Sequence, residues 1–210
     1  MACKGGFLFQ KSTCLPVKNI FNPRVTQGRH FWEYVNMMFN KPDSDRIKEF
    51  GPDRICAEWV LRNGGKIVWD NGNEITDYNL LPAEHHPVRK VQEIDATSSS
   101  ISHYGFSHLI GCTELKRIIL HDNNYIDDRA LQGLCYARDS LLHLQVSRCC
   151  NVTDDGLLSL KVLEKLKTLI LFELISVENL NACKKKLHTC LPNCQIKYKH
   201  STNTNNRYFP

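Results

Sequence analysis

Four short hydrophobic segments of this 210-residue chain can be laid over one another without internal gaps, and this repetition constrains the fold more than any other feature. In each segment the first, fourth, sixth and ninth positions hold apolar or small residues. These positions are Val91, Ile94, Ala96 and Ser99; Leu115, Ile118, Leu120 and Asn123; Leu141, Leu144, Val146 and Cys149; and Leu166, Leu169, Leu171 and Leu174. The first positions are 24, 26 and 25 residues apart, so one structural unit recurs along the chain.

This spacing is the period of a leucine-rich repeat, in which each unit contributes one short strand and one returning helix. The predicted fold is therefore α/β, a leucine-rich-repeat solenoid of about four repeats over residues 91–199, with parallel strands and outer helices. The segment CQIKYK (194–199) predicts a final edge strand with Ile196 inside. A solenoid presents an extended surface rather than a catalytic cleft, so the expected function is to bind another protein.

Residues 30–90 do not follow the repeat and predict a small helical module with a connector. Three helices are expected in HFWEYVNMMFNK, KPDSDRIKEFG and PDRICAEWVLRNGG, followed by a short strand in KIVWD. Because each repeat buries its core only against a neighbour, this module is expected to cap the open end of the solenoid. The polar, turn-rich stretch NGNEITDYNLLPAEHHP is the predicted connector, and residues 200–210 predict a disordered tail.

The basic excess of the chain is prominent at the N-terminus. The formal net charge is +5, and residues 1–29 contain five Lys or Arg and no acidic residue. The remaining residues sum to zero, which argues against a nucleic-acid-binding domain. The acid-free start predicts a mitochondrial transit peptide, with a disordered basic tail as the alternative. No apolar run reaches the roughly 20 residues that span a bilayer, so membrane association is expected to be peripheral or through a partner.

The sequence offers no strong catalytic arrangement, and the protein is expected not to be an enzyme. Asp127-Asp128 and Asp154-Asp155 lie where strands turn into helices, which favours helix capping over a catalytic carboxylate pair. Cys190 and Cys194 lack a second pair with zinc-binding spacing. Most repeat cysteines are expected to be reduced core residues, and they are Cys135, Cys149, Cys150, Cys183, Cys190 and Cys194.

Strand alternation predicts which repeat side chains face outward. The outward set is Glu93, Asp95 and Thr97; Arg117, Ile119 and His121; His143, Gln145 and Ser147; and Thr168, Ile170 and Phe172. Within it, Arg117, His143, Ile170 and Phe172 are the candidate partner-binding residues, because an exposed apolar pair beside charged groups is typical of a docking patch. The alternative is that a terminal helix or a neighbouring chain covers the apolar pair.

Several segments together resemble one known family. They are FWEYVNMMFNKPDSDRIKEFGPDRICAEWVLRNGG (31–65), DYNLLP (77–82), IDAT (94–97), GFSHL (105–109), NYIDD and NVTDDGL. On these residues the chain resembles the mitochondrial ATP synthase subunit s family, also called coupling factor B or distal membrane-arm assembly component 2-like. The resemblance implies a peripheral protein on the matrix side of the mitochondrial inner membrane. It also implies association with membrane-sector subunits of ATP synthase and support of coupled proton conduction.

The same resemblance implies a magnesium ion held by backbone carbonyls, and the matching positions are Gly51 in EFGPDR and Ala83 in LLPAE. Gly51 precedes Pro52 just past a predicted helix end, where its carbonyl is expected to be free of helix bonding. Mg²⁺ would add water ligands to complete an octahedron. The alternative is that no metal binds, or only a crystallisation ion. The Cys-x-Cys of vertebrate members is replaced by His121 and Asn123, so a dithiol function is not expected.

Two other functions stay open at this level. A related branch consists of assembly factors for the membrane arm of respiratory complex I. Helical modules also precede leucine-rich repeats in F-box ubiquitin-ligase adaptors, although LPAE at 81–84 follows the module here instead of opening it. The contacted subunit and the oligomeric state, including a homo-oligomer, are not set by the sequence. The presequence is expected to end between residues 20 and 30.

Overall fold

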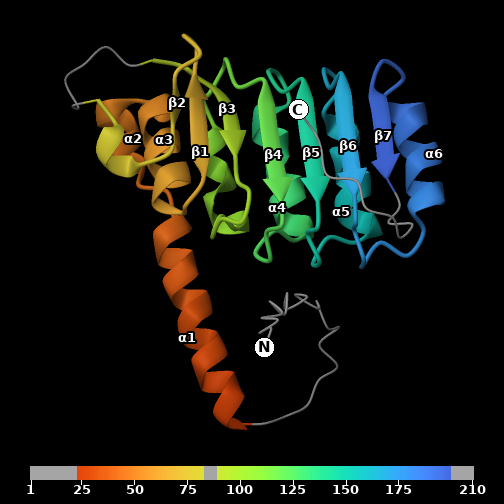
Figure 1. Ribbon diagram of the computed structural model, residues 1–210, viewed down its shortest axis with the longest axis horizontal. Coiled ribbons are helices and arrows are strands. Elements are labelled where there is room, and N and C mark those ends of the chain that lie inside the picture. The colour runs from red at the N-terminus through yellow and green to blue at the C-terminus, as the bar shows by residue number, and fades with distance from the viewer. Residues whose placement is uncertain (1–22, 83–88, 200–210) are drawn as a thin grey trace, which may run out of the picture.

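The structure is a computed structural model that describes residues 23–82 and 89–199, and one sheet organises them. Its seven strands follow the order β2-β1-β3-β4-β5-β6-β7 (Figure 1). Strands β3 to β7 run parallel, whereas β1 is antiparallel to both β2 and β3. The strands are β1 (Lys66–Trp69), β2 (Glu74–Ile75), β3 (Val91–Asp95), β4 (Arg117–His121), β5 (His143–Ser147), β6 (Thr168–Phe172) and β7 (Gln195–Lys199).

Helices lie before the sheet and between its parallel strands. Those before β3 are α1 (Pro23–Asn40), α2 (Ser44–Phe50), α3 (Pro52–Arg62) and η1 (Tyr78–Leu80). Those between the parallel strands are η2 (His103–Leu109), α4 (Asp128–Gly133), η3 (Leu134–Ala137), α5 (Asp154–Ser159), η4 (Leu160–Val162) and α6 (Leu180–Cys190). Helices α4 and α5 lie behind the strands in Figure 1, so within residues 23–82 and 89–199 the sheet has one helix-covered face and one helix-free face.

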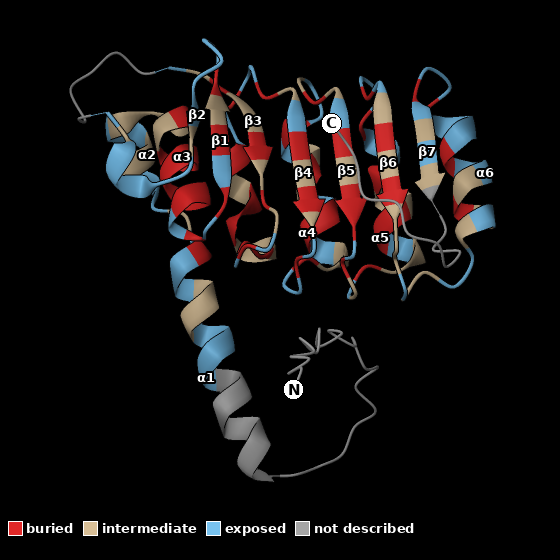
Figure 2. Cartoon of the chain, viewed as in Figure 1, coloured by how far each residue is buried: buried red, intermediate tan, exposed pale blue. Residues whose placement is uncertain are grey.

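The repeated apolar positions form the core between the sheet and its helices (Figure 2). Every aligned position is buried except Leu174, which is half-buried, so the alternation along each strand is confirmed. Burial of one Leu or Ile side chain stabilises the fold by about 1.5–3 kcal/mol. The α/β class and the parallel strands with intervening helices are confirmed. The sheet is open, with β2 and β7 at its edges.

The region before β3 differs from its prediction at two points. The three helices and the strand β1 are confirmed, but α1 begins at Pro23, inside the segment assigned to the transit peptide. The connector is not irregular throughout, because Glu74–Ile75 folds back on β1 as strand β2. Gly72 permits this turn, with φ of 82° and an N–H that donates to the Trp69 carbonyl at 2.9 Å. The apolar side chains of α1 are mostly exposed, Phe31 and Trp32 by 59% and 66%.

Buried polar groups hold the helical module to the sheet. Asn40, at the end of α1, is fully buried. Its Nδ2 donates to Asn63 Oδ1 and to the Ser100 carbonyl, both at 3.1 Å. Its Oδ1 accepts from Trp59 Nε1 at 2.9 Å and from the Ser102 backbone N–H at 3.0 Å. One amide therefore joins α1, α3 and the segment that follows β3.

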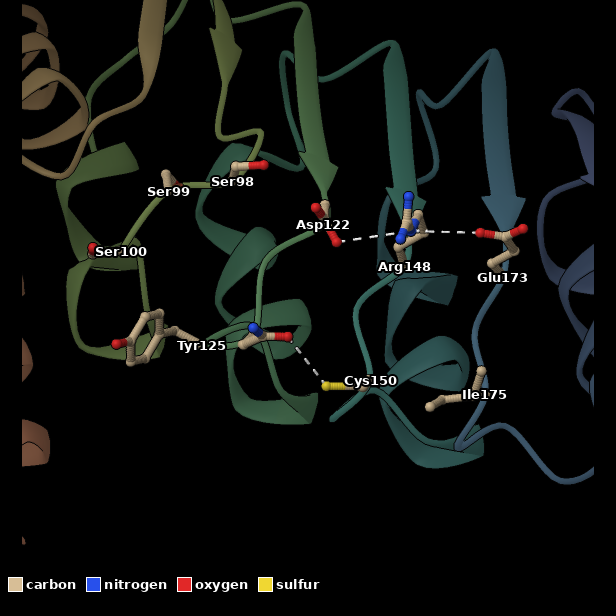
Figure 3. A pocket seen from close by; sticks show the side chains of 10 residues that line it. Ser98, Ser99, Ser100, Asp122, Tyr125, Arg148, Cys150, Glu173 and Ile175 are labelled. Atoms are coloured by element: carbon tan, nitrogen blue, oxygen red, sulfur yellow. Dashed lines mark hydrogen bonds and ion pairs between the residues drawn. The ribbon is translucent and has the colours of Figure 1, made fainter. Parts of the chain in front are cut away.

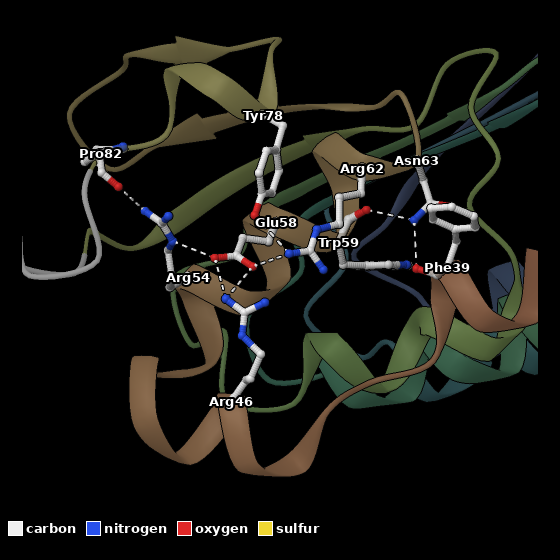
Figure 4. Close-up of polar contacts among 9 residues, drawn as sticks. All are labelled: Phe39, Arg46, Arg54, Glu58, Trp59, Arg62, Asn63, Tyr78 and Pro82. Carbon is white, nitrogen blue, oxygen red and sulfur yellow. Dashed lines mark hydrogen bonds and ion pairs between the residues drawn. The ribbon is translucent and has the colours of Figure 1, made fainter.

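Two buried carboxylates on α3 complete this attachment. Asp53 accepts from the Val91 backbone N–H at 3.0 Å and from Lys90 Nζ at 2.8 Å, which connects α3 to the start of β3. Glu58, only 2% exposed, is surrounded by three guanidinium groups (Figure 4). Its oxygens lie 3.0 Å from Arg54 Nε and 3.1 Å from Nη2 of both Arg46 and Arg62. Hydrogen-bonded lysine and arginine partners offset the cost of burying these charges.

Candidate partner-binding surface

Strand register brings the four candidate partner-binding residues onto the helix-free face. Arg117 on β4 lies opposite His143 on β5, and both are exposed. Ile170 and Phe172 lie on β6 opposite Gln145 and Ser147 of β5, and both are half-buried. Neighbouring strands are about 4.8 Å apart, so a basic side chain and two apolar side chains share one continuous surface. Their role in binding stays a prediction.

The ion pair between Arg117 and Glu93 on this face is long and exposed. Arg117 Nη1 lies 3.9 Å from Glu93 Oε2, and their side chains are 48% and 38% exposed. An exposed pair at that distance contributes at most about 1 kcal/mol. The guanidinium of Arg117 is therefore able to exchange Glu93 for an acceptor on a partner.

Ser147 departs from the predicted outward row, because it is fully buried although its side chain points to this face. Its Oγ lies 2.7 Å from His121 Nδ1 and accepts from Gln145 Nε2 at 3.0 Å. The small hydroxyl sits below longer neighbours that cover it. Alternation gives the side of the sheet correctly, but the lengths of adjacent side chains decide the exposure.

Beyond the carboxyl ends of β3 to β6 lies a groove of about 560 Å³ that the sequence did not suggest (Figure 3). Arg148 Nε lies 3.7 Å from Asp122 Oδ1 and 3.5 Å from Glu173 Oε2, so charges alternate along it. The lining residues are Ser98, Ser99, Ser100, Asp122, Asn124, Tyr125, Arg148, Cys150, Glu173 and Ile175. The exposed side chains of Tyr125 and Ile175 add apolar surface to this rim.

A repeated backbone conformation builds this groove. Ser98, Asp122, Arg148 and Glu173 have φ of 52°, 50°, 54° and 49°, and each is the eighth residue of its unit. A left-handed conformation costs a non-glycine residue roughly 1 kcal/mol or more. It lets the backbone N–H of Asp122 and Arg148 donate to Ser147 and Phe172 carbonyls at 2.9 and 3.0 Å. The signal available in the sequence was the polar residue at this one position of every unit.

Among the paired aspartates, Asp127 caps a helix as predicted, whereas Asp128 and Asp154 link successive units and Thr153 caps α5. Asp127 Oδ1 accepts from the Ala130 backbone N–H at 3.0 Å at the start of α4. Asp128 accepts from the Thr153 N–H and hydroxyl of the next unit at 2.8 and 2.6 Å. Asp154 repeats this link one unit later, accepting from the Asn179 N–H at 3.2 Å. These carboxylates are engaged by backbone donors.

The structure describes half of the predicted magnesium site. Gly51 has φ of 83° between α2 and α3, and Ala83 lies outside the described residues. The expectation that the Gly51 carbonyl is free of helix bonding is wrong, because it accepts from the Ile55 N–H at 3.3 Å. Gly51 ends one helix and also begins the next. Its second lone pair still suits a cation, whereas the carbonyl of Pro82 is taken by Arg54 Nη1. Within residues 23–82 and 89–199, no three His, Cys, Asp or Glu side chains cluster as metal ligands.

The cysteines in the described ranges form no disulfide with one another. Cys149, Cys183 and Cys194 are buried as predicted, but Cys190 is exposed and Cys135 and Cys150 are half-buried. Burial raises the pKa of both Cys149 and Cys183 to about 11. These two thiols therefore stay protonated at neutral pH and are weak nucleophiles.

No family model matches the chain, but several individual proteins do. ATP synthase subunit s, mitochondrial, of Rattus norvegicus is 39% identical over 179 residues, which cover 83% of this chain and 90% of the relative. The proteins of that name from Mus musculus and Homo sapiens are 37% and 36% identical over the same shares.

The chain belongs to the ATP synthase subunit s family. The match to this family is too long to fit within the repeated strands alone, so it includes the helical module before them. The family assignment made from the sequence is therefore confirmed. Across the part of the chain that the structure describes, no helix is both long enough and apolar enough to cross a membrane.

Proposed function

We propose that the protein is a non-enzymatic accessory factor of mitochondrial ATP synthase that binds the membrane sector and supports coupled proton conduction. The observation that carries this proposal is the match to rat ATP synthase subunit s over 90% of that relative. The proposed location is the matrix side of the inner membrane, with peripheral attachment. The acid-free segment 1–29 supports a mitochondrial presequence in this proposal.

The proposed docking surface is the helix-free face around Arg117, His143, Ile170 and Phe172. A continuous sheet face that carries both an arginine and an aromatic side chain suits a protein partner, because such residues dominate binding energies at interfaces. We interpret the repeated units as leucine-rich repeats, whose 24–26-residue spacing and buried positions agree with that class. The non-enzymatic role is supported by aspartates that cap a helix or link successive units and by thiols whose pKa is raised.

The magnesium site is also a proposal, with the carbonyls of Gly51 and Ala83 as ligands and water in the other positions. The metal would hold the start of α3 against the segment after Pro82. Isothermal titration of the metal-free protein with Mg²⁺ tests this. No heat of binding would contradict it.

The experiment that tests the main proposal is mass spectrometry of proteins that co-purify from gently solubilised mitochondria. Membrane-sector subunits of ATP synthase are the expected partners, at levels well above an unrelated matrix protein with the same tag. Enrichment of complex I membrane-arm subunits instead would favour an assembly factor for that complex. Recovery with cytosolic ubiquitin-ligase components would favour an adaptor.

N-terminal sequencing of the organellar form checks the presequence, since an intact Met1 contradicts its removal.

A further inference from the structure

The two ends of this chain are basic and its central part is acidic, although the formal net charge of +5 does not show this. Residues 179–210 contain six Lys or Arg and no acidic residue, as residues 1–29 contain five and none. All 22 acidic residues lie in 30–178 with the other 16 basic residues, so that central part is negative. The zero net charge of residues 30–210 therefore hides a second basic segment, and five of its six basic residues lie in α6 and β7.

Within this segment, α6 presents a group of lysines at the end of the sheet farthest from α1 (Figure 1). Lys185 and Lys186 are exposed, and Lys184 Nζ lies 4.5 Å above the Tyr198 ring. Lys161, exposed on η4, faces the same helix. Among the described residues, none of these four lysines has a carboxylate oxygen within 4.0 Å of its ammonium group. The lysines therefore form a concentration of uncompensated positive charge.

A hollow of about 350 Å³ lies between α6 and the helical segment α5–η4. It is lined by Leu158, Lys161, Lys186, Leu187, Thr189 and Cys190. Its walls are mostly apolar. Lysine side chains can cover apolar surface with their methylene stems while the ammonium groups stay in water. An apolar hollow bordered by cations differs from a simple charged surface, which would have polar walls.

We propose that this site, the α6 lysine site, binds an anionic phospholipid of a membrane surface. Lys161 and Lys186 would hold the phosphate, and the adjoining methylene groups of the lipid would enter the hollow beside Leu158. A small inorganic anion makes no use of apolar walls, whereas a phospholipid satisfies both features. Lys185 adds long-range attraction, since each lysine near an anionic membrane contributes about 1 kcal/mol. This inference deepens the proposed peripheral attachment and rests on it.

The test uses the full chain and vesicles of phosphatidylcholine with and without cardiolipin, and measures the bound fraction by flotation. The expected result is binding only to cardiolipin vesicles, and weaker binding as salt increases. The triple variant Lys161→Gln/Lys185→Gln/Lys186→Gln should bind about 100-fold more weakly, from three contributions of about 1 kcal/mol. The matched control Lys41→Gln/Lys48→Gln/Lys66→Gln removes the same charge at the other end of the molecule and should bind as the wild type does.

The hollow is tested separately at its rim. Thr189→Glu places a negative charge there and should lower vesicle binding about 10-fold, whereas Thr189→Gln, of similar size, should not. Both residues replace an exposed side chain, and equal melting temperatures would show that the fold is kept.

Four outcomes overturn the α6 lysine site: equal binding to neutral vesicles, equal loss in the control triple variant, an unchanged bound fraction in the lysine triple variant, or capture of an acidic peptide without vesicle binding. An unchanged lysine triple variant would place the membrane contact elsewhere, with the exposed aromatic residues of α1 as the next candidate. Co-purification separates this failure from failure of the proposed function. If the wild-type protein binds cardiolipin vesicles but recovers no ATP synthase subunits, the proposed function is contradicted and the α6 lysine site is retained.

Discussion

The helical module before β3 and the parallel strands after it are both well packed, but their cores contain different chemistry. The module buries two carboxylates, Asp53 and Glu58, and the amide of Asn40, each with several partners. Among the described residues the parallel-strand region buries no charged carboxylate, and its interior is mainly Leu, Ile and Val. The stability of the module therefore depends on particular hydrogen-bond and ion-pair partners. The stability of the parallel-strand region depends on close packing of apolar side chains.

The largest expected effect comes from Glu58→Ala in the module. Removal of the carboxylate leaves three neighbouring guanidinium groups without their shared acceptor. Two of these groups, those of Arg46 and Arg54, are largely screened from water. The free energy of unfolding should fall by about 3–5 kcal/mol, measured by chemical denaturation. The control is Asp45→Ala, which removes an exposed pair with Lys48 and should change stability very little. Equal, small effects of both substitutions would show that polar partners do not hold the module.

The corresponding change in the strands is Leu169→Ala. Leu169 is fully buried on β6, so its truncation leaves a cavity and should cost about 2–5 kcal/mol. Leu144→Ala on the neighbouring strand should cost a similar amount, because the two residues are paired in register. Leu169→Met, which nearly conserves volume, should cost less than about 1.5 kcal/mol. A loss of the same size for Met would mean that shape, beyond volume, controls this core.

His108 lies at the junction of the two regions, and its titration should make their attachment depend on pH. The ring is buried and stacks on Trp59 of α3 at 5.1 Å, and burial lowers its pKa from 6.5 to about 4. Between these values the unfolded chain binds a proton that the folded chain excludes. The free energy of unfolding should therefore fall by about 3 kcal/mol as pH falls through this window.

Denaturation of the wild type and of His108→Phe from pH 7 to pH 4 measures this contribution. Phenylalanine keeps a ring against Trp59 but does not titrate, so its stability should depend less on pH. Other acidic and basic groups contribute to both proteins and cancel in the difference. Parallel pH curves for the two proteins would show that His108 is not protected from protonation.

The smallest effect on stability, and the sharpest on binding, is expected for Phe172→Ala on the helix-free face. The side chain is half-buried, so stability should fall by about 1 kcal/mol, well below the loss in Leu169→Ala. Interface aromatics often cost about 2 kcal/mol when truncated, which predicts roughly 30-fold weaker association with ATP synthase. Thr168→Ala on the same strand is the matched control. Unchanged association for Phe172→Ala would show that docking occurs elsewhere.

This contrast also explains how far the sequence could predict the molecule. Alternation on a strand is set by local backbone geometry, so the burial of Leu169 and the outward position of Phe172 followed from spacing alone. The burial of Asn40 and Glu58 did not, because partners of Asn40 lie up to 62 residues away in the chain. Ser147 was predicted on the correct side of the sheet, but its burial was missed because it depends on neighbouring side chains such as His121 and Gln145. The groove at Asp122 and Arg148 required a left-handed backbone conformation, which is uncommon for any residue other than glycine.

The carboxylates that join successive units have a direction, and it coincides with the direction in which a ribosome makes the chain. Asp128 precedes the Thr153 segment that it binds, and Asp154 precedes Asn179 in the same way. Each acceptor has therefore been synthesised before the donor that needs it, and a new unit is added to one that is already complete. Loss of the last unit leaves an aspartate that water can solvate, whereas loss of an earlier unit removes the acceptor for the unit that follows it. The nascent protein can thus accumulate order from its first repeat towards its last.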